Sequence, residues 1–478
     1  MGSLSAANRA LAVALGLTVL VFGSGSARAG DWLRFHGPGG SGINPDARPL
    51  PLKWSETENL RWKRKLPGPG SSSPIVVGKR LFVTCWTGYG VDRDNVGDEK
   101  DLRRHLICLD RDTGNVLWDR SIEPVLPEDP YSGNFTQHGY ASHTPVSDGR
   151  RVYVFFGKTG ALAFDLDGTK LWQTSVGTGS GPNGWGSASS PILHKNLVIV
   201  TATAESQSLV ALDKETGKEV WRHADAGFSG TWGTPILVDC GHGRTDLVIA
   251  VPYKIWGFNP DDGKPRWQCE GLSTNSICTS AFAHDGVVYV LETGPRGGGT
   301  MAVRAGGEGD VTKTNVLWRG KERSRIGTPI VDSGRIYWFG NHVADCIDAA
   351  TGKEIYQVRL PGAPPAGLAS AGPGPGAAGR GPGPGPGRKP GGRYGGRGGM
   401  RGQDYSSPVL ADGKIYFLSR SGETYVYTAG PEFKLLSQNR FAADGGDFSS
   451  TPAISDGQLF IRSSKYLYCV ADSTGKGR

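Results

Sequence analysis

The sequence predicts an all-β fold, an eight-bladed β-propeller of four-stranded antiparallel blades. Three observations predict it. A strand–turn–strand hairpin recurs along the chain, as in SLVALDKETGKEVWR from Ser208. A second hairpin, preceded by a small residue and a proline, recurs between copies of the first. The last unit lacks its fourth strand, and a stretch near the start of the chain can supply it. Four-stranded units with a period in the forties are typical of propeller blades.

The first hairpin combines a turn glycine with an aromatic residue four positions later. Glycine suits the turn because it adopts positive φ at little cost. The pairs are Gly114 and Trp118, Gly168 and Trp172, Gly217 and Trp221, Gly263 and Trp267, and Gly352 and Tyr356. This slot lies in the fourth strand, where large aromatic side chains dock neighbouring blades. We therefore expect a structural docking set: Trp62, Trp118, Trp172, Trp221, Trp267, Trp318 and Tyr356.

The second hairpin supplies one anchor for each blade. The anchors are Pro74, Pro145, Pro191, Pro235, Ala281, Pro329, Pro408 and Pro452. Most neighbouring anchors lie 44 residues (Pro191 to Pro235) to 48 residues (Ala281 to Pro329) apart. Two gaps are longer, at 71 residues (Pro74 to Pro145) and 79 residues (Pro329 to Pro408). Eight anchors predict eight blades.

Ring closure is predicted from the two ends of the repeat region. The last unit stops at YLYCVADSTGKGR, whereas NLRWKRKL, within residues 57–66, places Trp62 in the aromatic slot. Pairing of this N-terminal strand with the last blade would remove exposed sheet edges. The predicted organisation is an N-terminal extension over 30–56 and a propeller over 57–478.

Residues 1–29 resemble a secretory signal peptide. Arg9 precedes the apolar run ALAVALGLTVLVF, and ARA stands before Gly30. The apolar run is too short to span a membrane. The first cysteine is Cys85, so a lipid anchor at the cleavage site is not expected. We expect an exported, soluble, monomeric chain in the periplasm or outside the cell.

The net charge of +8 is not a property of the predicted propeller body. The signal holds two of the excess positive charges. The Gly-, Pro- and Arg-rich segment 361–402 holds six more, which leaves the body formally neutral. That segment cannot bury enough apolar surface to fold, so we expect a disordered insertion within the propeller. A neutral body gives no reason to expect nucleic-acid binding.

The cysteines and histidines give little indication of chemistry. Cys108, Cys346 and Cys469 occupy a small-residue position of the repeat, where cysteine acts as a small apolar group. A bridge between Cys85 and Cys108 stays open. His138 and His143 are the one histidine pair with near-ligand spacing, which is a weak signal. The sequence predicts no catalytic, metal-binding or cofactor-binding residue.

The repeats, such as ALDKETGKEVW, resemble the pyrroloquinoline quinone (PQQ) repeat over nearly the whole mature chain. The opening DWLRFHGPGGSGI is similar to the start of many exported PQQ-repeat proteins. One branch of the superfamily, the quinoprotein alcohol dehydrogenases, holds PQQ with calcium over the ring axis. The other, the BamB-like proteins, shares the propeller without the cofactor and acts as a scaffold in outer-membrane protein assembly.

The resemblance implies features for the enzyme branch that this sequence lacks. Those enzymes carry a disulfide between adjacent cysteines, and no Cys-Cys pair occurs here. They also need a general base and hard oxygen ligands for calcium. The aspartates that recur, Asp110, Asp165, Asp213 and Asp348, are better interpreted as turn residues. The scaffold branch differs too, because its best-known members are lipoproteins.

The predicted function is therefore an exported, non-catalytic propeller that binds a protein or an envelope polymer. The alternative is a PQQ-dependent quinoprotein oxidoreductase that uses PQQ with Ca²⁺ on an alcohol or a sugar.

The predicted binding face is the one that carries the longest connections. Chain direction alternates within a blade, so fourth-to-first and second-to-third connections share one face, and the short turns share the other. Segments 86–104 and 361–402 both belong to the first face. Loops on a rigid scaffold are the usual place for binding. Candidate ligand-face residues just before first strands are Tyr140, Trp185, Trp232, Arg325, Tyr405 and Asp447.

Overall fold

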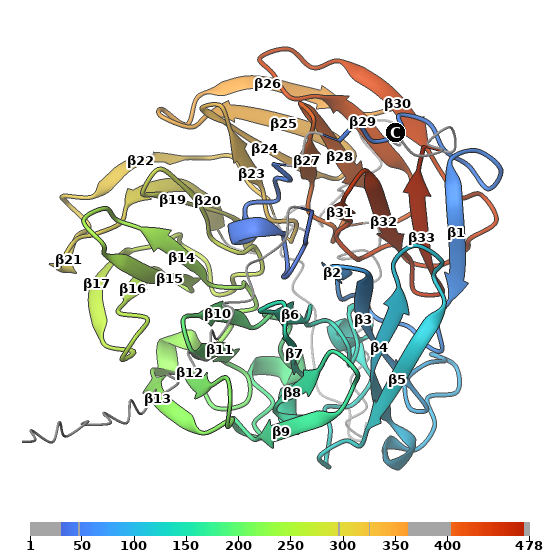
Figure 1. Ribbon diagram of the computed structural model, residues 1–478. Helices are drawn as coiled ribbons and strands as arrows, with labels where there is room; N and C mark the ends of the chain where they lie inside the picture. The colour runs from blue at the N-terminus through green and yellow to red at the C-terminus, as the bar shows by residue number, and fades with distance from the viewer. Residues whose placement is uncertain (1–29, 46–47, 295–296, 325, 362–402, 473–478) are drawn as a thin grey trace, which may run out of the picture.

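The computed structural model describes residues 30–45, 48–294, 297–324, 326–361 and 403–472. Eight β-sheets stand around a central axis and form a closed ring (Figure 1). The predicted fold class, an all-β eight-bladed propeller of four-stranded antiparallel blades, is confirmed. The predicted signal peptide and nearly all of the predicted insertion lie outside the described residues.

The strands of each blade follow the chain from the axis outward. Blade 1 contains β2 (Ile75–Val77), β3 (Arg80–Thr87), β4 (Arg103–Asp110) and β5 (Val116–Ile122). Blade 2 contains β6 (Val146–Ser147), β7 (Arg151–Phe155), β8 (Ala161–Asp165) and β9 (Lys170–Thr174). Blade 3 contains β10 (Ile192–His194), β11 (Leu197–Ala202), β12 (Ser208–Asp213) and β13 (Glu219–Ala224). Blade 4 contains β14 (Ile236–Asp239), β15 (Thr245–Val251), β16 (Lys254–Phe258) and β17 (Pro265–Glu270).

The other four blades repeat this order. Blade 5 contains β18 (Phe282–His284), β19 (Val287–Gly294), β20 (Gly297–Arg304) and β22 (Val316–Gly320). Blade 6 contains β23 (Ile330–Asp332), β24 (Arg335–Gly340), β25 (Val343–Asp348) and β26 (Glu354–Arg359). Blade 7 contains β27 (Val409–Ala411), β28 (Lys414–Leu418), β29 (Thr424–Thr428) and β30 (Leu435–Asn439). Blade 8 contains β31 (Ala453–Ser455), β32 (Gln458–Arg462), β33 (Tyr466–Ala471) and β1 (Leu60–Lys65).

The burial of each strand follows its place in the blade. The second strand β11, LVIVTA, is buried along its whole length because neighbouring blades pack on both of its faces. Strands that are covered on both faces read as continuous apolar runs. The outer strand β13, EVWRHA, buries only Trp221 fully and leaves its other residues partly or fully exposed. The core therefore lies between the blades.

The N-terminal strand closes the ring. β1 pairs antiparallel with β33, and Trp62 lies opposite Cys469. Blade 8 is thus built from both ends of the propeller (Figure 1). A bulge between Leu60 and Trp62 sets the register of the pair.

Most aromatic residues of the fourth strand contact the hairpin of the next blade. The Trp172 indole donates a hydrogen bond to Lys214 O at 2.9 Å, and its ring packs against Gly217. Equivalent indole bonds join Trp62 to Arg111, Trp118 to Leu166, Trp221 to Pro260 and Trp318 to Ala349. The Tyr356 ring packs against Phe433 of the next blade.

Trp267 is the exception in this docking set. Its indole donates to Asp246 Oδ2 of its own blade at 2.7 Å, and its ring lies against Gly257. The reason is the next blade, whose third-to-fourth connection is enlarged. That connection carries β21 (Gly309–Asp310), which pairs parallel with β17. Trp267 therefore has no short glycine turn to contact.

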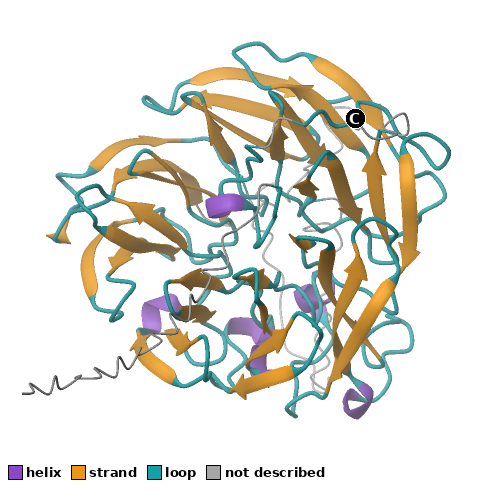
Figure 2. Ribbon diagram, in the orientation of Figure 1, coloured by secondary structure: helices purple, strands orange, loops and turns teal. Residues whose placement is uncertain are grey.

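The two faces of the ring differ in their connections. Five 3-10 helices lie in fourth-to-first or second-to-third connections (Figure 2): η2 (Glu99–Asp101), η3 (Gly133–Gln137), η4 (Gly157–Thr159), η5 (Pro182–Gly184) and η6 (Ala226–Phe228). We name this side the loop face and the opposite side the turn face. The expectation that the turn face keeps only minimal turns is wrong in blade 5, because the connection that contains β21 lies on this face.

The N-terminal segment enters the axial channel, which the sequence did not indicate. Trp32 bridges to Val76 in β2, and Ile43 bridges to Leu410 in β27. Between them, η1 (Pro38–Gly40) lies near the centre of the ring (Figure 1). Trp32 is completely buried. This segment therefore fills part of the channel that the first strands surround.

The described residues contain no helix that is long and apolar enough to cross a membrane. The seven cysteines, all within the described ranges, form no disulfide. Burial raises the pKa of the Cys85 and Cys108 thiols to about 12 each. These two side chains are therefore apolar packing groups.

Candidate ligand-binding site at the ring mouth

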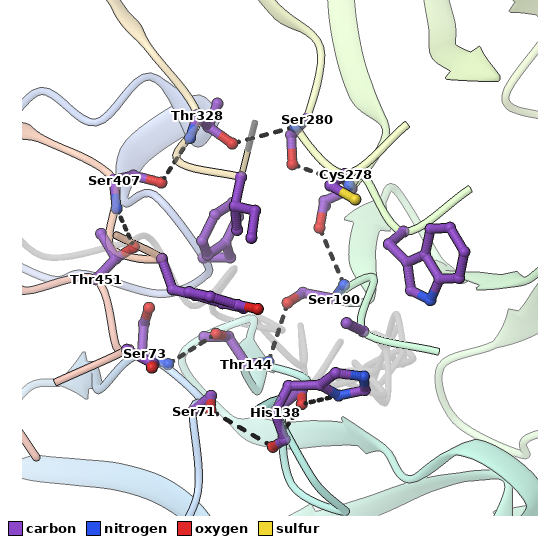
Figure 3. Close-up of a pocket in the computed structure, with 18 of the residues that line it drawn as sticks. Ser71, Ser73, His138, Thr144, Ser190, Cys278, Ser280, Thr328, Ser407 and Thr451 are labelled. Carbon is purple, nitrogen blue, oxygen red and sulfur yellow. Dashed lines mark hydrogen bonds between the residues drawn. The ribbon is translucent and has the colours of Figure 1, made fainter. Parts of the chain in front are cut away.

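A cavity on the loop face opens at the ring axis. Its volume is about 160 Å³. Its walls come from the residues just before the first strand of each blade, so every blade contributes to it (Figure 3). Phe35 of the N-terminal segment also lines it. The cavity is thus a pocket at the ring mouth and lies beside the segment that fills the channel.

A series of Ser and Thr side chains surrounds the axis in this cavity. Except in blade 1, the hydroxyl oxygen accepts a hydrogen bond from the backbone N–H of the equivalent residue in the preceding blade, as when Thr144 N donates to Ser190 Oγ at 3.0 Å. The series runs through Ser73, Thr144, Ser190, Thr234, Ser280, Thr328, Ser407 and Thr451 (Figure 3). We name these residues the hydroxyl ring. Between blade 8 and blade 1 the bond is different, because Ser450 Oγ donates to Ser72 O at 2.9 Å.

The hydroxyl ring retains hydrogen-bonding capacity. A hydroxyl group has one donor hydrogen and two acceptor lone pairs. The backbone bonds use one lone pair on each of seven oxygens. Within the described residues, none of these hydroxyls donates to a protein group. Donor hydrogens therefore remain available around the axis.

Two tryptophans form an aromatic wall of the cavity. The rings of Trp185 and Trp232 lie 5.5 Å apart between centroids at 37°. The Trp232 indole donates to Gly186 O at 2.9 Å, which ties the two loops together. Both side chains are partly exposed, so part of each ring remains accessible.

His138 fixes the position of the Trp185 loop. Its Nε2 lies 3.1 Å from Trp185 O, and its Nδ1 lies 2.9 Å from Ser142 Oγ. A carbonyl oxygen can only accept, so Nε2 carries the hydrogen. Burial lowers the pKa of His138 to about 4. The imidazole is therefore neutral at ordinary pH.

Tyr405 forms another part of the wall and is supported by two charged residues. The Arg420 guanidinium lies 4.5 Å from the centre of the Tyr405 ring. Arg420 Nε donates to Asp447 Oδ2 at 2.5 Å. Asp447 thus holds Arg420 against Tyr405 and does not itself line the cavity.

A buried polar network lies beside the cavity and joins blades 1, 2 and 3. Arg104 pairs with Glu128 at 2.6 Å, and Lys158 pairs with Asp129 at 3.2 Å. Ser187, two residues after Trp185, donates to Glu205 at 2.5 Å.

Two members of this network have strongly shifted pKa values. Burial raises the pKa of Glu205 to about 7 and lowers that of His143 to about 3. The network therefore favours uncharged Glu205 and His143 while it anchors the mouth loops.

The structure brings together only some of the predicted ligand-face residues. Trp185, Trp232 and Tyr405 line the cavity. Tyr140 does not: its ring is buried against Trp86, and its hydroxyl donates to Asp129 O at 2.6 Å. The side chain of Arg325 lies outside the described residues.

Sequence reasoning missed the hydroxyl ring, His138 and Phe35. The hydroxyl ring left a signal in the sequence, since a Ser or Thr precedes each of the eight anchors. The pattern showed only that a small residue is required there, not that its hydroxyl faces the axis.

The cavity lining does not fit PQQ with calcium. PQQ is a polycarboxylate, and calcium prefers several oxygen ligands that include carboxylates. Among the described lining residues there is no Asp, Glu, Lys or Arg. The described residues also hold no group of three His, Cys, Asp or Glu side chains that could bind a metal ion.

The family assignment comes from a match to a family model. The model described as outer membrane protein assembly factor BamB matches residues 96–224 and 163–373, which together cover more than half of the chain. The chain belongs to the BamB family. Its propeller repeats and its ring architecture agree with this assignment.

Solved structures show the same fold in BamB and in dehydrogenases. BamB from Moraxella catarrhalis is similar with a TM-score of 0.55 and 11% identity, over 88% of this chain and 99% of that one. A europium-containing methanol dehydrogenase is similar with a TM-score of 0.58 and 11% identity, over 92% of this chain and 98% of that one. Quinohemoprotein alcohol dehydrogenase from Comamonas testosteroni is similar with a TM-score of 0.58 and 12% identity, over 95% of this chain and 82% of that one. At these identities the likeness shows the fold alone.

One curated relative is similar over a shorter region. Tetrathionate hydrolase from Acidithiobacillus ferrooxidans is 22% identical over 252 residues, which are 44% of this chain and 47% of that protein. This chain therefore matches less than half the length of that relative.

Proposed function

We propose that this protein is an exported, non-catalytic member of the BamB family that binds a protein or an envelope polymer at the ring mouth. The observation that carries the proposal is the composition of the mouth cavity. It combines an aromatic wall with a hydroxyl ring, and its described lining has no carboxylate or cation. Such a lining suits recognition of a neutral surface, whereas a quinone–calcium site requires charged ligands.

The position of the cavity supports the same proposal. It opens on the loop face, where most of the longer connections lie. The mouth loops are held by backbone and side-chain bonds, such as the one from Trp232 to Gly186. A rigid platform of this kind lowers the entropic cost of binding. We expect the partner to contact the loop face and the protein to act as a scaffold.

The alternative is a PQQ-dependent oxidoreductase. It is supported by the similarity of the fold to a methanol dehydrogenase and a quinohemoprotein alcohol dehydrogenase. The scaffold proposal is preferred because the described cavity lining lacks the groups that hold the quinone and the metal.

The experiment that separates the two functions is a reconstitution assay. The purified protein is incubated with PQQ and Ca²⁺, passed through gel filtration, and scanned for quinone absorbance. A dye-linked assay with alcohols and sugars follows. The scaffold proposal expects no retained quinone and no dye reduction. Stoichiometric quinone retention with substrate-dependent dye reduction would establish the oxidoreductase instead.

A further inference from the structure

We infer that the mouth cavity binds one ring of an uncharged saccharide, such as the exposed end of a neutral envelope glycan. The inference deepens the proposed function, on which it rests, by naming the chemical class of the ligand. The cavity of about 160 Å³ sets the size. Cavities of about 150 Å³ accept a single six-membered ring. One sugar residue is therefore the appropriate size, and the rest of a chain would extend over the loop face.

The aromatic wall favours the apolar side of a sugar ring. A pyranose carries C–H groups on its faces and hydroxyl groups around its edge. The faces of Trp185 and Trp232 carry the negative part of the aromatic quadrupole, which attracts C–H groups and repels anions. Tyr405 supplies a third aromatic side chain from a different blade. Aromatic rings on different sides can thus contact a sugar ring while its edge faces the axis.

The hydroxyl ring complements the edge of the sugar. Seven of its oxygens each have a donor hydrogen that no described protein group accepts. Each also has a second lone pair, so it can donate to or accept from a sugar hydroxyl. An apolar ligand would leave these buried groups without partners, at a cost of about 1–3 kcal/mol for each unsatisfied group.

The absence of charge in the described lining argues against an anionic ligand. A buried anion without a cation beside it loses its hydration with no compensation. The guanidinium of Arg34 does not line the mouth cavity. It lines an adjoining small cavity that shares four lining residues with the first: Phe35, Thr234, Ser280 and Thr328. His138 is neutral at ordinary pH for the reason given above. The ligand that matches all these features is polyhydroxylated, ring-shaped and uncharged.

Calorimetric titration with defined oligosaccharides tests the inference. The probes are cellohexaose, maltohexaose and chitohexaose, which are neutral, and hexagalacturonate, which is anionic. We expect at least one neutral probe to bind with a Kd below about 1 mM, a weak affinity for a single-ring site. Hexagalacturonate should bind at least about 10-fold more weakly than that probe.

Variants locate the binding. Trp185→Ala and Trp232→Ala should each weaken binding about 10-fold or more, since buried aromatic contacts dominate binding energy. Thr328→Val keeps the side-chain shape and removes the hydroxyl, and should weaken binding several-fold. Tyr253→Ala is the matched control, because Tyr253 is an exposed aromatic residue on the same face that does not line the cavity. Thermal melts confirm that each variant is folded.

The outcomes separate this inference from the proposed function. Failure of all three neutral probes to bind, with no PQQ retention, would overturn the inference and leave the scaffold proposal standing. Retention of PQQ would overturn the scaffold proposal itself. The inference would also be overturned if a neutral probe bound equally well to both tryptophan variants and to the wild type. Tighter binding of hexagalacturonate than of the neutral probes would overturn it as well.

Discussion

At the residue scale, the turn glycines that contact the docking aromatics meet two requirements: a positive φ and no side chain where the aromatic ring packs. Gly217 has φ of 70°, and a Cβ at this position would lie 2.6 Å from the Trp172 ring. Gly413 has a similar φ of 65° with nothing within 4 Å of the same added atom. The two positions therefore differ in packing but not in backbone conformation.

We predict that Gly217→Ala destabilises the protein more than Gly413→Ala. The control, Gly413→Ala, should lower the free energy of unfolding by about 1–2 kcal/mol, because a side chain disfavours the left-handed backbone conformation. Gly217→Ala should cost roughly 1–3 kcal/mol more, because the methyl group displaces the indole. Chemical denaturation of both variants measures the difference. Equal losses of stability in the two variants would show that contact with Trp172 is not the reason for a glycine at position 217.

Glu205 gives a pH-dependent prediction. Its pKa is raised from 4.5 to about 7 in the folded protein, mainly by burial. The folded state therefore binds the proton more tightly than the unfolded state, so stability falls as pH rises between these two values. Glu205→Gln should remove this dependence, because the amide stays neutral and can still accept from Ser187.

The measurement is unfolding of wild type and Glu205→Gln at pH 5 and at pH 8. The two proteins share every other titrating group, so their difference isolates Glu205. We expect near-equal stability at pH 5 and a variant that is more stable by on the order of 2 kcal/mol at pH 8. A difference that does not change with pH would contradict the assigned shift.

The docking tryptophans show how far sequence reasoning reaches for single residues. Spacing from the turn glycine identified the slot, because blade packing repeats locally. Trp267 occupies the same slot yet bonds to Asp246 in its own blade. Its position depends on the enlarged connection of the next blade, which the spacing around Trp267 does not encode.

At the element scale, β1 is the part on which ring closure depends. It supplies the outer strand of blade 8, and Trp62 is buried against the hairpin of blade 1. Without β1, the edge of β33 would be exposed, and an unpaired edge invites association with other chains.

We predict that deletion of residues 57–66 lowers the melting temperature and produces oligomers or aggregates. Size-exclusion chromatography and thermal melts measure both effects. A synthetic peptide of residues 57–66, added to the truncated chain, should restore part of the stability and serves as the control. An unchanged melting temperature would show that the ring does not depend on this strand.

The N-terminal segment before β1 could not be predicted in the same way. It has no repeat pattern, and its contacts, such as the bridge from Ile43 to Leu410, join residues far apart in the sequence. The blades were predictable because each is a local unit whose strands pair in order. A segment that enters a channel formed by all the blades is defined only once the ring exists.

At the scale of the whole molecule, the ring converts a repeated sequence feature into one site. A Ser or Thr before each anchor is a minor local preference in each blade. Closure brings these residues together around the axis as the hydroxyl ring. The sequence thus indicated the loop face and three of the aromatic residues that form the wall: Trp185, Trp232 and Tyr405. It did not indicate the chemistry of the cavity, which arises from eight blades together.

We propose that the protein binds its partner at the mouth of the loop face. The most direct measurement is site-specific photo-cross-linking in cells that produce the protein. A photoreactive amino acid replaces Asn134, which lines the mouth cavity, in one variant and Gly413 on the turn face in another. We predict adducts with a protein or an envelope polymer from position 134 and none from position 413. Adducts from position 413 alone would contradict this prediction.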